Sequence, residues 1–163
     1  NYRMFKDSDF IEIFHILNKL YTQNGSLKKL FEYGYNQNKT IQTMLQTVID
    51  YFYSNVQNKV GRGFYNMIPN PKNKGAMKKM NLFLRWMVRK GPVDLGIWDF
   101  IPTSELLIPL DLHVSRLSRE MGLLTRKADD FKAVLELSAK LKEFEPNDPV
   151  KFDFSLFGLG VNR

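Results

Sequence analysis

The sequence contains no cysteine among its 163 residues. Disulfide bonds, zinc sites with thiolate ligands and iron–sulfur clusters are therefore excluded, because each needs cysteine side chains. The sequence has only two histidines, His15 and His113, and they lie far apart. A histidine-rich metal site is not expected either, so we predict no metal cluster and no cofactor.

Long apolar runs are also missing. No run approaches the roughly 18 residues that a membrane-spanning helix needs, and the first residues lack the apolar core of a signal peptide. We therefore expect no membrane association and a cytoplasmic location. The chain enters a helical pattern almost directly after Asn1. This start predicts an incomplete fold, with an N-terminal portion outside this chain.

Acidic residues are absent from one long central segment. From Tyr51 to Val93 the chain has no Asp and no Glu. The same segment carries nine cations, which exceed the net charge of +7 of the whole chain. Such a local excess of positive charge is typical of a surface that binds nucleic acid, because phosphate contacts depend on it. The alternative is a solvated basic face without a ligand.

Apolar residues recur at three- and four-residue spacing along most of the chain, and strand-like alternation is scarce. This periodicity predicts an all-α protein. The first helix is expected to bury an apolar stripe from Phe10 to Tyr21. A central helix over 76–90 has apolar residues on most of its sides. Further helices are expected over 41–52, 112–121, 129–144 and from 149 onward, with a short helical turn after Ser26.

Helical periodicity stops between Val56 and Gly75, where the sequence reads QNKVGRGFYNMIPNPKNKG. This stretch is rich in Gly, Asn, Pro and Lys, and it is too short to link two domains. We predict that it is a functional loop or hairpin leading into the central helix.

Asp111 lies between apolar residues in LIPLDLHVSRL, directly before an expected helix. A carboxylate at that position caps the helix by accepting hydrogen bonds from its first amides, which stabilises it by about 1 kcal/mol. The same amides and the helix dipole keep the carboxylate ionised. An ionised carboxylate can also stabilise positive charge on a substrate, so capping and catalysis are compatible for Asp111.

The stretch LDLHVSRLSREMGLL resembles the Asp-x-His-Val-x-Arg segment of the helix-hairpin-helix DNA glycosylase superfamily. The stretches KGAMKKMNLFLRWMVR, VDLGIW and DPVKFDFSLFGLG are similar to further blocks of an uncharacterised bacterial family of that superfamily. Together the blocks span about Pro69 to Val161. The resemblance implies a glycosylase-like helical bundle in a single domain over 1–163. Residues 1–57 form a helical part, and residues 58–163 hold the hairpin and the catalytic helices.

The resemblance also implies a catalytic pair. Lys78 matches the lysine of the bifunctional members, and Asp111 matches their catalytic carboxylate. A damaged base would be flipped out of duplex DNA into a pocket. Lys78 would attack the anomeric carbon while Asp111 stabilises the transition state, and the Schiff base formed would permit strand cleavage. Without the resemblance, Lys78 would be interpreted as a lysine that contacts phosphate.

Other residues receive roles around this pair. Phosphate contacts of DNA are expected for Lys59, Arg62, Lys72, Lys74, Lys79, Arg85 and Arg116, the last with a structural role as the alternative. Base-pocket candidates, each of which could instead belong to the core, are Phe64, Tyr65, Trp86 and Trp98. His113 belongs to the motif and is expected to pack.

Two features depart from the usual pattern of the superfamily. The hairpin normally has a glycine-x-glycine turn, whereas NPKNKGAM has one glycine and more lysines. Lys78 and Asp111 are 33 positions apart, a longer spacing than in most members. This spacing is similar to that of the archaeal 8-oxoguanine DNA glycosylase branch, which implies an oxidised purine as the substrate base.

The sequence therefore favours a DNA-repair glycosylase with AP-lyase activity. A second hypothesis is a non-catalytic DNA- or RNA-binding module that retains the fold. A third is an α-helical protein-interaction domain, which does not explain why the acid-free segment coincides with the expected hairpin.

Overall fold

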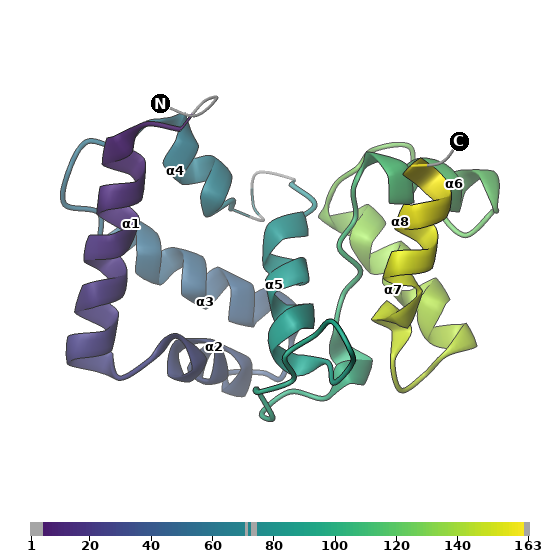
Figure 1. Ribbon diagram of the computed structural model, residues 1–163, viewed down its shortest axis with the longest axis horizontal. Coiled ribbons are helices and arrows are strands. Elements are labelled where there is room, and N and C mark those ends of the chain that lie inside the picture. Colours follow the sequence, from purple (N-terminus) through teal and green to yellow (C-terminus); the bar gives the residue numbers. More distant parts are fainter. Residues whose placement is uncertain (1–4, 71, 73–74, 162–163) are drawn as a thin grey trace. The chain divides into compact units, whose positions relative to one another are not determined.

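The structure is a computed structural model that describes residues 5–70, 72 and 75–161. Within these residues it is all-α, with eight α-helices and no strand (Figure 1). The prediction of an all-α protein is confirmed. The α-helices are α1 (Asp7–Lys19), α2 (Leu27–Asn36), α3 (Ile41–Ser54), α4 (Arg62–Met67), α5 (Lys78–Val88), α6 (Leu112–Glu120), α7 (Phe131–Phe144) and α8 (Asp153–Val161).

Shorter helical turns accompany these helices. They are the π-helical turn η1 (Leu20–Asn24) and the 3-10 turns η3 (Thr103–Glu105) and η4 (Pro149–Phe152). Every helix in the described part of the chain is too short or too polar to cross a membrane.

The chain divides into two compact units, Asn1–Asn73 (unit 1) and Lys74–Arg163 (unit 2). The boundary lies near the end of the Gly-, Asn-, Pro- and Lys-rich stretch in which the helical periodicity stops. The single domain over 1–163, with a division near residue 58, stays a prediction.

The core of unit 1 is formed mainly where α2 packs against α3. Met44, Leu45, Val48 and Ile49 of α3 are fully buried there. Both helices begin at hydroxyl caps: Ser26 accepts a hydrogen bond from the Lys29 N–H, and Thr40 accepts one from the Thr43 N–H. These caps satisfy amides that have no partner within the helix.

Helix α1 corrects the prediction for the first apolar stripe. Phe10, Phe14 and Tyr21 are exposed, whereas the carboxylates of Asp9 and Glu12 are 0% and 1% exposed. Hydrogen bonds from distant backbone amides make this orientation stable, because they satisfy the buried carboxylates.

Asp9 and Glu12 hold the segment after α3. Asp9 accepts a hydrogen bond from the Gly61 N–H at 2.6 Å, and Glu12 accepts one from the Gln57 N–H at 2.5 Å. A Cβ atom at Gly63 would lie 2.4 Å from Asp9 Oδ2, so the absence of a side chain permits the close approach. The stretch predicted to be a loop or hairpin contains helix α4 instead.

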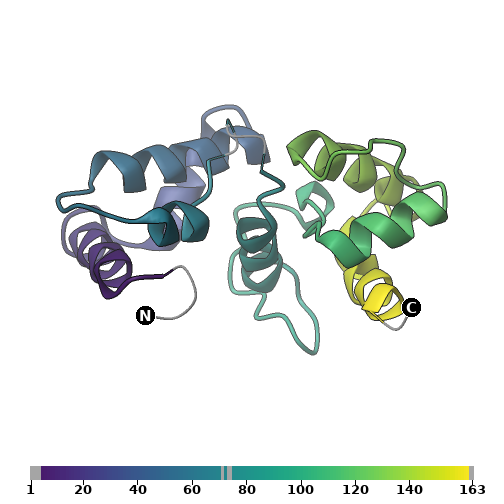
Figure 2. The ribbon, with the colours of Figure 1, turned by 90° about the horizontal axis from the view of Figure 1, so that it is seen from above.

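Unit 2 is built around α6, α7 and α8, and α8 lies alongside α6 in both views (Figures 1 and 2). The core contains Val114 and Leu117 of α6 and Val134 and Leu137 of α7, all buried. At Gly160 of α8, a Cβ atom would lie 2.8 Å from the His113 carbonyl oxygen, which explains the glycine at that contact. This packing fixes the first turn of α6 against α8.

Candidate active site

Helix α5 begins at Lys78 because of an unusual turn before it. Met77 is buried and has left-handed backbone dihedrals, φ 55° and ψ 27°. This conformation is strained for a residue with a side chain. The buried Asn81 side chain donates a hydrogen bond to the Ala76 carbonyl oxygen at 3.3 Å. Asn81 thereby anchors the turn that directs Lys78 out of the helix start.

Asp111 is the N-cap of α6, as predicted, and uses its two carboxylate oxygens differently. Oδ1 accepts a hydrogen bond from the Val114 N–H at 2.9 Å, which is the capping interaction. Oδ2 accepts one from Lys78 Nζ, also at 2.9 Å. The side chain of Lys78 is 45% exposed and that of Asp111 is 12% exposed. One carboxylate therefore caps a helix and binds an accessible ammonium.

The hydrogen bonds of Asp111 keep its carboxylate ionised. Burial alone would raise the pKa of Asp111, but the hydrogen bonds from the Val114 amide and the Lys78 ammonium outweigh it. The pKa therefore lies below its ordinary value of 3.8. The site holds a permanent negative charge at neutral pH.

The pair lies at a cavity of about 270 Å³ within unit 2. Most of the lining is apolar or aromatic, and its remaining residues are charged. The lining residues are Lys78, Leu82, Arg85, Trp86, Pro109, Asp111, Asp153, Phe154 and Phe157. Trp86, Phe154 and Phe157 are each between 42% and 54% exposed, so aromatic surface is available to a ligand.

His113 connects α6 to α8 beside this cavity. Its Nδ1 lies 3.2 Å from the Gly160 carbonyl oxygen, and its ring meets the Phe157 ring edge to face at 5.9 Å. The same Phe157 ring lies 6.0 Å from Lys78 Nζ. These contacts agree with a packing role for His113, which positions Phe157 near the lysine.

Arg85 requires a correction. Its side chain is 1% exposed and pairs with Asp94 and Asp153, while the Phe154 ring stacks 4.1 Å from the guanidinium carbon. Arg89 belongs to the same cluster, because it also pairs with Asp94, at 2.9 Å. A guanidinium buried among carboxylates does not reach DNA phosphate at the surface, so we withdraw the phosphate contact assigned to Arg85.

The remaining cations are distributed over both units. Lys79 and Arg116 of unit 2 are exposed. Lys59, Arg62 and Lys72 of unit 1 are exposed as well, and Lys74 lies outside the described residues. The pKa of Lys79 lies below its ordinary value, because part of the Lys79 side chain is buried. Phosphate contact stays a prediction for these six residues.

The four aromatic candidates separate into two classes. Phe64 and Trp98 are 0% and 6% exposed and belong to the cores of their units, the alternative that the sequence left open. Burial removes both from the base-pocket candidates. Tyr65 is 50% exposed in unit 1, and Trp86 is 43% exposed and lines the cavity of unit 2. Trp86 is the candidate that the structure brings to the Lys78–Asp111 pair.

Comparison with known proteins gives one match. Residues 1–162 match the family described as protein of unknown function (DUF2400). The chain belongs to the DUF2400 family. No curated protein and no solved structure matches it.

In this member of the DUF2400 family, sequence reasoning missed the part of the cavity that α8 supplies. Asp153, Phe154 and Phe157 all lie in the DPVKFDFSLFGLG block, and the motif resemblance implies no role for them. Asp153 carries the same signal as Asp111, a single acid in an apolar stretch. Burial raises the pKa of Asp153 despite its pairing with Arg85, and the negative charge of Asp111 adds to this effect.

The cavity combines an ammonium, two carboxylates in different environments and several aromatic rings. Carboxylates with pKa values shifted in opposite directions are typical of catalytic sites. Among the described residues, no group of three or more His, Asp or Glu side chains is placed to hold a metal ion. The groups present can provide nucleophilic and electrostatic catalysis on a ligand with an aromatic ring.

Proposed function

We propose that this protein is a DNA-repair glycosylase with AP-lyase activity, which excises an oxidised purine from duplex DNA. The observation that carries the proposal is the 2.9 Å contact between Lys78 Nζ and Asp111 Oδ2 at an aromatic cavity. These two residues come from different elements, and the glycosylase resemblance pairs the same two. The helix-hairpin-helix glycosylase fold is part of this proposal, and the lesion class rests on the resemblance to the archaeal branch.

The proposed reaction begins with a flipped nucleotide whose base enters the cavity. Aromatic faces suit this task, because stacking on an aromatic side chain stabilises a base by about 1–3 kcal/mol. Trp86, Phe154 and Phe157 offer such faces and come from two helices that line the cavity. The base would leave the duplex at a cost of a few kcal/mol, which is lowest for a damaged pair.

Lys78 then acts as the nucleophile. Its ammonium first gives one proton to the base, and the neutral amine that results is the nucleophile. Nζ of this amine forms a bond to C1′ of the sugar as the bond from C1′ to the base breaks, and the electron pair leaves with the base. A second proton goes to O4′, which opens the ring. The third stays on the protonated Schiff base. Asp111 stabilises the positive charge that develops at C1′ and O4′.

The Schiff base accounts for the lyase step. It acidifies C2′, whose proton goes to a water molecule. The electron pair left on C2′ forms a double bond to C3′ as the bond between C3′ and O3′ breaks, so the strand is cleaved with the phosphate as the leaving group. Hydrolysis of the imine would regenerate the Lys78 amine. The carboxylate of Asp111 remains ionised throughout, which its lowered pKa favours.

Borohydride trapping tests the proposal. The protein is incubated with duplexes that carry 8-oxoguanine, uracil or an abasic site, and borohydride reduces any Schiff base to a stable adduct. We expect an adduct with the wild-type protein and none with Lys78→Gln. The matched control is Lys79→Gln, which removes the neighbouring ammonium and should keep the adduct.

The outcomes separate the competing functions. Equal adduct yields in wild type and Lys78→Gln would remove Lys78 as the nucleophile. DNA binding that falls steeply with salt, without excision or trapping on any duplex, would overturn the enzyme and favour the non-catalytic binding module. Circular dichroism of each variant establishes that lost trapping does not reflect unfolding.

A further inference from the structure

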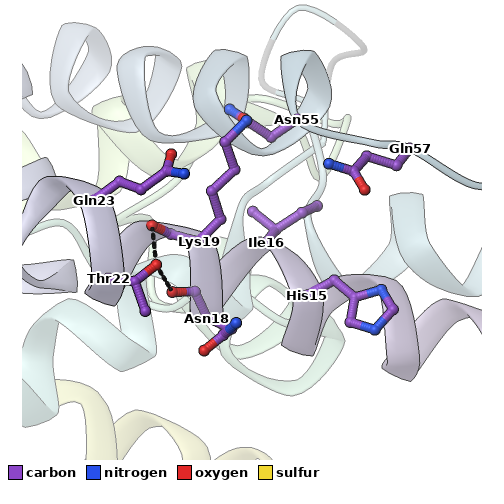
Figure 3. Close-up of a pocket in the computed structure, with 8 residues that line it drawn as sticks. All are labelled: His15, Ile16, Asn18, Lys19, Thr22, Gln23, Asn55 and Gln57. Atoms are coloured by element: carbon purple, nitrogen blue, oxygen red, sulfur yellow. Dashed lines mark hydrogen bonds between the residues drawn. The ribbon is translucent and has the colours of Figure 1, made fainter.

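Unit 1 contains a second hollow to which no role has been assigned. It measures about 460 Å³ and lies at the end of α1, along η1 and beside the residues that follow α3. Figure 3 shows the Lys19 side chain extending through the middle of this hollow, with Gln23 and Gln57 on its two sides. Asn55 and Thr22 complete its polar rim.

The backbone hydrogen-bond pattern changes from α-helical to π-helical beside this hollow. The chain passes from α1 into the π-helical turn η1 between Lys19 and Leu20. Single π-helical turns are rare and often occur at functional sites. The Thr22 hydroxyl hydrogen bonds to the carbonyl oxygens of Asn18 and Lys19, at 2.8 and 3.2 Å. These two acceptors are therefore already occupied at the rim.

The Lys19 ammonium and the amide groups of Asn and Gln side chains also line the hollow. In Figure 3 the amide nitrogens of Gln23 and Gln57 face the Lys19 side chain from its two sides, and the Lys19 ammonium ends beside Asn55. The Lys19 side chain is half-buried and pairs with no carboxylate in the part of the chain that the structure describes. Unpaired ammonium groups held between amide donors attract anions, because charge-assisted hydrogen bonds are stronger than neutral ones.

Glu12 contacts one of the lining residues, Gln57, but does not itself line the hollow. Glu12 accepts hydrogen bonds from the Gln57 N–H and from Asn58 Nδ2, so both of its oxygens are occupied. No Asp or Glu is among the residues that line the hollow. The lining is one ammonium and several amides, with His15 at the edge.

We propose that this hollow binds a phosphate group, with Lys19 as the charged contact and Gln23 and Gln57 as neutral donors. Phosphate oxygens accept several hydrogen bonds at once, which suits donors that converge from separate segments. The group can belong to a DNA backbone or to a free phosphate monoester. This site does not depend on the proposed glycosylase activity, because every contributing residue lies in unit 1.

A titration with inorganic phosphate tests the site directly. Nitrogen-15 NMR follows the side-chain signals of Lys19, Gln23 and Gln57 at constant ionic strength, with chloride as the reference anion. We expect saturable shifts in the wild-type protein and an affinity at least about tenfold lower in Lys19→Gln. The matched control is Lys132→Gln, which removes an exposed lysine of α7 in unit 2 and should bind phosphate like the wild type.

A neutral variant separates charge from geometry. Gln23→Met removes an amide donor at similar size and keeps the charge of Lys19, so a smaller loss of phosphate affinity is expected. Phosphate shifts that are absent in the wild type, or equal in wild type and Lys19→Gln, would overturn the site. Thermal unfolding of each variant verifies that the fold persists.

Binding of undamaged duplex DNA identifies the source of the phosphate. If it is a backbone phosphodiester, the negative slope of log Kobs against log salt should become shallower by about 0.9 in Lys19→Gln. An unchanged slope together with lost phosphate binding would assign the hollow to a phosphate monoester. Borohydride trapping on an abasic duplex at saturating Lys19→Gln should match the wild type, so failure of this proposal and failure of the glycosylase proposal are distinguishable.

Discussion

In unit 1 the buried carboxylates of Asp9 and Glu12 receive hydrogen bonds from backbone amides of distant segments, whereas in unit 2 Asp111 and Asp153 pair with cationic side chains, Asp111 in addition to capping its own helix. Backbone amides are fixed by the fold, so a carboxylate that binds them joins two segments of chain. The ammonium of Lys78 ends a flexible side chain that is 45% exposed, so it can leave its carboxylate and meet a ligand.

The partners of a buried acid therefore indicate its role. Removal of a backbone-bound carboxylate should affect stability, whereas removal of the lysine-bound carboxylate should affect chemistry. Asp153 is intermediate between these two cases. Its partner Arg85 is buried, but the Asp153 side chain lines the cavity.

The largest expected effect is on excision. Asp111→Asn should slow base excision by about 10²-fold to 10³-fold, because it removes an ionised group from the transition state. Its free energy of unfolding should change by less than about 1 kcal/mol, because Asn caps helices as well as Asp does. Single-turnover excision and urea unfolding measure the two quantities.

Asp9→Asn is the opposite control for Asp111→Asn, since excision per folded molecule should stay at the wild-type rate. An Asp111→Asn variant with normal excision and a large loss of stability would show that Asp111 is a structural residue, as Asp9 is proposed to be.

The next effect is on the stability of unit 2. Arg85→Met leaves Asp153 buried without its cationic partner and Asp94 with Arg89 alone, which should cost about 3–5 kcal/mol of unfolding free energy. The control Arg116→Met replaces an exposed arginine of α6, and its effect should stay within about 0.5 kcal/mol. Urea denaturation followed by circular dichroism measures both, and equal losses would argue against the buried cluster as the cause.

A smaller loss is expected in unit 1. Lys6 and Gly61 donate to different oxygens of Asp9, so Asp9→Asn places an amide NH₂ opposite one of these two backbone N–H groups, which should cost about 1–3 kcal/mol. Asp7→Asn alters an exposed acid in the same turn of α1 and should be nearly neutral. Hydrogen exchange of the Gly61 amide gives a local measurement, and unchanged protection in Asp9→Asn would contradict the role of the carboxylate.

The smallest effect appears in the pH dependence. Burial raises the pKa of Asp9, but hydrogen bonds from backbone amides outweigh it, so the pKa lies below its ordinary value of 3.8. Its contribution to stability is therefore present above about pH 4 and is lost as the pH falls through the lower pKa of the folded state. The stability difference between wild type and Asp9→Asn should shrink between pH 5 and pH 3 in urea denaturation.

Asp153 should titrate in the opposite direction. Its pKa is raised by burial, so protonation favours the folded state as the pH falls. Carbon-13 NMR of the carboxyl groups should place its midpoint above 3.8 and the midpoint of Asp111 below it. Midpoints in the reverse order would contradict the distinction between the two acids of the cavity.

Local signals predicted much of the fold. The hydroxyl caps at Ser26 and Thr40 and the acidic cap at Asp111 mark helix starts that the structure confirms. These predictions succeed because a cap and its amides lie within three residues of each other. The stripe from Phe10 to Tyr21 was wrong for Phe10, Phe14 and Tyr21, although Leu20 is buried as expected. The error arises because the partners of Asp9 and Glu12 lie 52 and 45 residues away.

The candidate site shows the same limit. Lys78 and Asp111 carry signals of their own, a helix start and a motif, and the structure brings them together. The burial of Arg85 could not be predicted, since its partners Asp94 and Asp153 lie on either side of α6 and α7 in the sequence. The αL conformation of Met77 has no local signal either, because residues with side chains rarely adopt it.

The two oxygens of Asp111 have different partners, so the contact between Asp111 and Lys78 depends on whether the first turn of α6 is closed. If the first turn of α6 frays, Oδ1 loses the Val114 amide and the carboxylate is no longer directed at Lys78. The exchange rate of that single amide with deuterium then reports the fraction of molecules in which the ammonium has its acceptor in place.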